Sequence, residues 1–142
     1  MKRIMIMSSF FMICLLSLPA SAGQGLAIIV NPENNSQLDL LELRRIFLGK
    51  SRAFPDGTEA VPLNQAPGSS IRIEFASKVL KKNEGNLNAY WARMLFSSRA
   101  APPKEIDSAK EIKQMVSKDL HLISYINTDD VDDSVRVLMI IP

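Results

Sequence analysis

Residues 61–75 read VPLNQAPGSSIRIEF and predict a strand, a loop and a helix in direct succession. Residues 60–63 are apolar and include Pro62, which cannot donate to a ladder, so they predict a short strand at an edge or a strand end. The proline, glycine and serines of residues 65–70 predict a loop. Ile71, Phe75 and Val79 follow at helical spacing and predict a buried helix face. This succession is typical of an α/β domain.

The loop of this stretch is also the main candidate for a binding site. The first turn of a helix has unpaired N–H groups and a partial positive charge, which favour an oxyanion. We therefore predict anion contacts from Gly68, Ser69 and Ser70, with Gln65 and Arg72 as secondary contacts. Arg72 would add a charge-assisted hydrogen bond. The alternative is that Ser69 or Ser70 only caps the helix.

The rest of the chain extends this pattern outward in both directions. Apolar runs predict further strands at residues 26–30, 122–126 and 135–141. Helical periodicity predicts three further helices, which begin near Asp39, Asn86 and Ser108. Pro102 and Pro103 predict a linker without regular structure at residues 97–103. The predicted fold is α/β, with one mixed sheet of about four strands and about four helices.

Three local signals predict the start of the first of these helices, its C-terminal end, and a tight turn that follows it. Asp39 and Glu42 have the spacing of a capping box. Gly49 predicts a left-handed C-terminal cap. Gly57, after Pro55 and Asp56, predicts a tight turn in which the glycine takes a positive φ.

The first 22 residues predict a cleavable signal peptide. Lys2 and Arg3 precede an apolar run, and Ala20-Ser21-Ala22 offers the small residues of a cleavage site. The predicted mature domain is residues 23–142, exported and periplasmic. Cys14 is the only cysteine and lies in the predicted signal, so we expect no disulfide and no cysteine metal ligand. Lipidation at Cys14 is not expected, because the residue before it is the bulky Ile13.

Length and composition limit the classes of protein that fit. The chain has 142 residues, of which 46% are apolar and 23% charged, as in a single globular domain. It holds 17 basic and 15 acidic residues, and Lys2 and Arg3 account for the excess. A neutral domain lacks the basic footprint of a nucleic-acid-binding protein, so no nucleic-acid partner is expected.

Several other residues are candidates for a binding or metal site. The acidic run at residues 128–133 lacks the glycine and distal glutamate of an EF-hand loop and predicts a solvated turn. His121, as a lone histidine, predicts a surface or structural role, and no metal or cofactor is expected. No spacing indicates a nucleophile and base, so an enzyme is not expected. Tyr90 and Trp91 predict core, or a partner-binding patch if exposed. A basic cluster predicts either a guide for an anion or a solvated helix end, and consists of Arg44, Arg45, Lys50 and Arg52.

Several segments, in order, resemble the periplasmic substrate-binding proteins of phosphate ABC transporters. Residues 40–50, LLELRRIFLGK, resemble that family's helix ending in Ile-Phe-x-Gly-Lys. Gly68-Ser69-Ser70 resembles its Gly-Ser-Gly-Thr anion loop, and Ile123-Ser124-Tyr125-Ile126 resembles its Ile-Gly-Tyr strand. Four shorter segments resemble the family more weakly. They are the turn at 56–57, the strand at 61–63, the helix segment at 90–93 and the linker at 102–103. The resemblance implies a single lobe of a periplasmic binding-protein-like fold.

The chain departs from that family in the loop and in length. The family usually has an arginine just before the loop, where this chain has Asn64-Gln65. Its members have two lobes that close on the ligand, whereas this chain has residues for one. The resemblance implies an exported binding protein for phosphate or a similar oxyanion, with a membrane transporter or envelope protein as partner, or self-association to complete the cleft. The alternative is a periplasmic protein-interaction module that has kept the lobe and lost anion binding.

Overall fold

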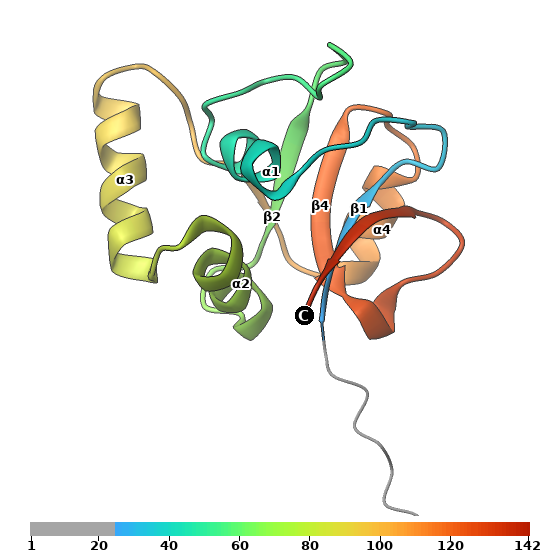
Figure 1. Ribbon diagram of the computed structural model, residues 1–142. Helices are drawn as coiled ribbons and strands as arrows, with labels where there is room; N and C mark the ends of the chain where they lie inside the picture. The colour runs from blue at the N-terminus through green and yellow to red at the C-terminus, as the bar shows by residue number, and fades with distance from the viewer. Residues whose placement is uncertain (1–24) are drawn as a thin grey trace, which may run out of the picture.

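A computed structural model describes residues 25–142, so the predicted signal peptide lies outside the described residues. The described chain forms one open mixed sheet with the strand order β3-β2-β4-β1-β5 (Figure 1). The strands are β1 (Leu26–Val30), β2 (Val61–Gln65), β3 (Lys104–Ile106), β4 (Leu122–Asn127) and β5 (Arg136–Ile141). β2 pairs in parallel with β3 and β4, and β1 pairs antiparallel with β4 and β5.

Helices cover both faces of this sheet. They are α1 (Leu40–Phe47), α2 (Ser70–Phe75), which continues as a π-helix (Ala76–Leu80), α3 (Glu84–Phe96) and α4 (Ala109–Val116). A short 3-10 helix (Thr128–Asp130) joins β4 to the last connection. The α/β prediction is thus confirmed, with five strands in the described residues instead of about four.

The core lies on both sides of β1, whose five residues are all buried. Leu26, Ile28 and Val30 pack with the first three helices, and Ala27 and Ile29 pack with α4. This division follows from the alternation of side chains along a strand. Figure 1 shows α1 and α4 on opposite sides of the sheet and α3 at its outer edge. The loop after β2 and the start of α2 lie on the side of the first three helices.

The local caps and turns form as predicted. Asp39 and Glu42 make the full capping box of α1. Gly49 and Gly57 have φ values of 68° and 89°. Ser108 accepts a hydrogen bond from the N–H of Glu111 at the start of α4.

Two predictions about the middle of the chain were wrong. The cap of α3 is Asn83, whose side chain accepts a hydrogen bond from the N–H of Asn86, so α3 begins before the predicted cap. Residues 104–106 form β3, although two prolines precede them and the prediction had no strand there. The strand forms because the edge of β2 offers a parallel partner, with Leu63 opposite Lys104 and Gln65 opposite Ile106.

Candidate functional site

The loop between β2 and α2 has an open outer surface. Gly68 and Ser70 are exposed, and no atom lies within 4 Å of the place where a Cβ on Gly68 would stand. The N–H of Ser69 donates to the carbonyl of Ala66 at 3.2 Å, which closes the turn. A small ligand can therefore approach the backbone of this turn without displacing a side chain.

Ser69 occupies the N-cap position of α2 without acting as a cap. Its backbone is extended, as at most N-caps, but its side chain accepts no hydrogen bond from the first helical turn. The Oγ atom is buried and has no hydrogen-bond partner among residues 25–142. Buried hydroxyl groups usually have a partner, so this one has unused capacity for a hydrogen bond. The side chain of Ser69 therefore does not cap the helix.

Arg72 is buried and its charge is already compensated. Its Nη1 donates to the carbonyl oxygen of Gln65 at 3.2 Å and lies 3.0 Å from Oε1 of Glu105. Its Nε lies 3.9 Å from Oε1 of Glu84. The guanidinium thus joins α2 to β3 and to the first residue of α3. Two carboxylates beside one guanidinium leave a net negative charge at this point, which opposes a bound anion.

Gln65 is the last residue of β2 before the loop, and its side chain is hydrogen-bonded to β4. Its Nε2 donates to the carbonyl oxygen of Tyr125 at 2.9 Å, and its side chain is buried. The Tyr125 hydroxyl donates to Oδ1 of Asn64. Burial raises the pKa of Tyr125, so this hydroxyl stays protonated and remains a donor. Gln65 is therefore anchored to β4 by one hydrogen of its Nε2 amide group.

The structure brings the predicted site residues to one corner of the fold, at the end of β2 and the start of α2. Sequence reasoning missed the residues that surround them: Asn64, Glu84, Glu105 and Tyr125. Glu105 lay beside a predicted linker, and its charge alone gave no sign of a partner. Tyr125 follows the strand pattern, and nothing local signals that its hydroxyl meets Asn64.

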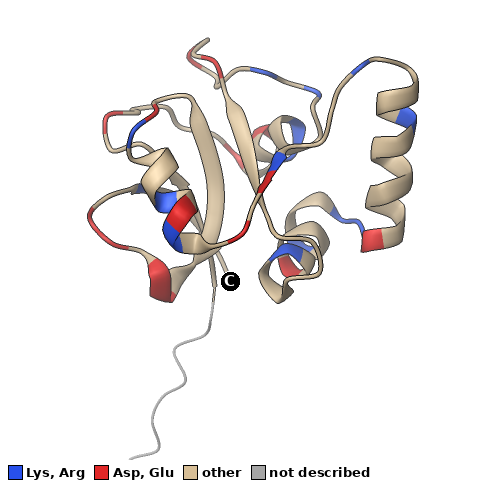
Figure 2. Cartoon of the chain, turned by 180° about the vertical axis from the view of Figure 1, so that it is seen from behind, with Lys and Arg blue, Asp and Glu red and all other residues tan. Residues whose placement is uncertain are grey.

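The other candidate site residues make ordinary surface contacts. His121 is exposed, and its Nδ1 lies 3.0 Å from Asp119. Hydrogen bonds from Lys113 and Ser134 lower the pKa of Asp132 to about 2. Between residues 25 and 142, no three His, Cys, Asp or Glu side chains lie close enough to hold a metal ion. Figure 2 shows basic and acidic positions interspersed over the fold.

Trp91 belongs to the main core, as the helical spacing predicted, and is 7% exposed. Tyr90 is half-buried and its hydroxyl donates to the carbonyl oxygen of Leu48 at 2.6 Å. The two rings meet edge to face, with centroids 5.1 Å apart. Together the two side chains hold α3 against the end of α1. The helix α3 is otherwise remote from the sheet. Among the helices of residues 25–142, none has the length and apolarity that a bilayer span requires.

The fold is shared with solved substrate-binding proteins. An ABC-type phosphate transport receptor from Vibrio cholerae superposes with a TM-score of 0.66 and 21% identity, over 81% of this chain and 45% of that chain. A putative phosphate ABC transporter substrate-binding protein from Clostridium perfringens, with bound phosphate, gives 0.63 and 23%, over 81% and 44%. PstS from Borrelia burgdorferi gives 0.59 and 15%, over 81% and 46%. No protein-family model matches the chain.

These similarities define the class of fold. The chain has the architecture of a single lobe of a periplasmic binding protein, with one mixed sheet between helices. It spans less than half the length of the structures that it matches. At this level of identity the likeness establishes the fold, and binding has to be argued from the residues of this chain.

Proposed function

We propose that the protein is exported and binds phosphate or a similar oxyanion at the turn formed by Gly68, Ser69 and Ser70. The observation that carries this proposal is the buried Oγ of Ser69, which has no partner among the described residues and stands at the start of a helix. A hydroxyl donor beside first-turn N–H groups suits an oxyanion. The similar fold of a Clostridium perfringens protein with bound phosphate supports the same choice of ligand.

The surroundings imply modest affinity. Arg72 is engaged by Glu105 and Glu84, so the anion would be held mainly by hydroxyl and backbone N–H groups. Neutral donors contribute less than charge-assisted ones. One lobe also covers the anion from one side only, and water weakens each hydrogen bond on the open side. We propose that a membrane transporter, an envelope protein or a second copy of the chain completes the cleft.

The first prediction concerns Ser69. We expect the purified protein to bind phosphate saturably, and Ser69→Ala to weaken that binding by about tenfold, because one donor is removed from a partly desolvated site. Isothermal titration with phosphate, with sulfate as a second anion, measures both values. Ser77→Ala is the matched control, since Ser77 is an exposed serine on the same helical segment. Equal affinity in the two variants would remove Ser69 from the site.

The second prediction concerns the carboxylate that competes for Arg72. Glu105→Gln keeps the size of the side chain and removes the charge that lies 3.0 Å from Nη1. We expect phosphate affinity to rise by about tenfold, because the guanidinium is then available to an anion. Glu111→Gln on α4 makes the same charge change on the opposite side of the sheet and serves as the control. An unchanged phosphate affinity in Glu105→Gln would show that Arg72 does not act on the anion.

A second candidate function is a protein-interaction module. It is favoured by the C-terminal end of α3, where Phe96 is 95% exposed beside Leu95, which is 54% exposed. Apolar side chains that are this exposed side by side are typical of a contact surface. The same titration separates the two functions: no heat and no thermal stabilisation up to millimolar phosphate would exclude the anion site and favour the interaction role.

A further inference from the structure

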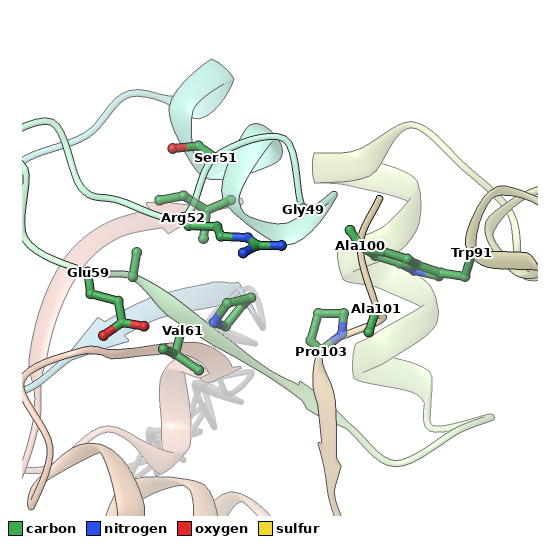
Figure 3. Close-up of a pocket in the computed structure, with 12 residues that line it drawn as sticks. Gly49, Ser51, Arg52, Glu59, Val61, Trp91, Ala100, Ala101 and Pro103 are labelled. Atoms are coloured by element: carbon green, nitrogen blue, oxygen red, sulfur yellow. The ribbon is translucent and has the colours of Figure 1, made fainter. Parts of the chain in front are cut away.

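A hollow lies at the beginning of β2, at the opposite end of the strand from the turn formed by Gly68, Ser69 and Ser70. Its volume is about 310 Å³, at the lower end of the range for small-ligand pockets. The hollow is drawn in Figure 3. Its apolar lining comes from α1, β2, α3 and the segment before β3, and includes Ile46, Ala60, Pro62, Trp91, Ala101 and Pro103.

The hollow exists because β3 begins late. β3 pairs with β2 only from Leu63 onward, so Val61 and Pro62 have no strand beside them on that edge. A bare strand edge normally leaves unpaired N–H groups. Pro62 has none, so this part of the edge can stay open with little loss of hydrogen bonding. The opening thus follows from the strand pairing of the sheet and is not a packing defect.

Two opposite charges stand at the rim of the hollow. Arg52 and Glu59 lie on the two arms of a small hairpin, in which the N–H of Ala60 donates to the carbonyl of Arg52 at 2.9 Å. Neither side chain belongs to any of the ion pairs found within residues 25–142. Figure 3 shows the Arg52 guanidinium extending over the hollow toward Gly49 and Ala100, whereas the Glu59 carboxylate lies on the side of Val61.

From this arrangement we infer that the hollow binds a small zwitterion with an apolar side chain, that is, a free amino acid or a dipeptide. Its carboxylate would meet Arg52, its ammonium group would meet Glu59, and its side chain would lie on the apolar floor beside Pro103. A simple anion is repelled by Glu59 and a simple cation by Arg52, so only a ligand with both charges gains from both rim groups. This site does not depend on phosphate binding.

The test uses four leucine-based ligands that differ in charge and in length. L-leucine and the dipeptide Leu-Leu are zwitterions, N-acetyl-leucine lacks the ammonium group, and leucinamide lacks the carboxylate. We expect saturable binding of at least one zwitterion by isothermal titration and by chemical-shift changes near Trp91. Each singly charged analogue of leucine should bind about tenfold more weakly, because one charge-assisted contact is lost. The comparison of leucine with Leu-Leu shows which length fits.

Three variants connect this preference to the rim. Arg52→Gln should abolish the preference for leucine over leucinamide and keep the preference over N-acetyl-leucine, and Glu59→Gln should do the reverse. Arg45→Gln, an exposed arginine outside this hollow, should change neither preference. Because all three side chains are exposed, the variants are expected to fold, which a melting curve checks. Absence of saturable binding of both zwitterions at 10 mM (roughly the weakest binding of interest), or preferences unchanged in the rim variants, would overturn the proposal.

Discussion

Replacing Phe75 with alanine is expected to lower the free energy of unfolding by about 3–5 kcal/mol, the usual cost of deleting a buried aromatic ring. Phe75 is 2% exposed and stacks on Tyr125 with ring centroids 3.9 Å apart and planes 1° from parallel. Its other neighbour is Phe47, at 4.7 Å and 60°. The ring therefore joins α2 to β4 and to α1, and its loss leaves a cavity among three elements.

Chemical denaturation followed by circular dichroism measures this effect. The matched control is Ile73→Ala on the same helix, because Ile73 is 47% exposed and has less apolar area to lose. We expect a cost of about 1 kcal/mol or less for the control. Similar losses in the two variants would mean that α2 is not anchored through Phe75. Since Tyr125 also contacts Asn64 and Gln65, Phe75→Ala should in addition weaken phosphate binding.

Gly49→Ala is expected to cost about 2–5 kcal/mol, from two separate causes. Gly49 has a φ of 68°, a conformation that a side chain disfavours. A Cβ at this position would also lie 2.8 Å from the Cβ of Ala100, with the Trp91 ring 3.5 Å away on another side. The turn after α1 must therefore approach the linker closely, and only glycine permits that approach.

Two further variants separate the causes. Gly57 has a φ of 89° but no atom within 4 Å of its Cβ position, so Gly57→Ala should show only the conformational cost of about 1–2 kcal/mol. Adding Ala100→Gly to Gly49→Ala removes the atom that is crowded, and the double variant should recover the difference in a double-mutant cycle. No recovery, or equal costs at Gly49 and Gly57, would show that the contact with Ala100 is not tight in solution.

Local patterns were sufficient for much of the fold. The apolar run Leu26–Val30 predicted a strand, and the strand is buried along its whole length. Asp39 with Glu42 predicted the capping box of α1. The positive φ of Gly49 could be predicted because a helix end has a limited set of conformations. Each of these signals lies within a few residues, and the free energy that it reflects is local as well.

The candidate site was predicted in part, and for the same reason. Gly68, Ser69 and Ser70 could be placed at a helix start from spacing alone, since a strand, a turn and a helix follow one another there. The absence of a partner for the Ser69 hydroxyl among residues 25–142 could not be predicted, because a serine at an N-cap normally makes the capping hydrogen bond. The partner of Arg72 was equally hidden, since Glu105 lies far along the chain.

Strand pairing between distant residues determined the edge of the sheet and the hollow beside it. β3 has two charged residues out of three and no strand pattern, and it is a strand only because the edge of β2 accepts it. Its short length leaves Val61 and Pro62 uncovered, which opens the hollow between Arg52 and Glu59. Strand formation depends on what lies alongside, whereas a helix satisfies its own backbone. The four helices and the capping box of α1 could therefore be predicted from neighbouring residues, and the edge of the sheet could not.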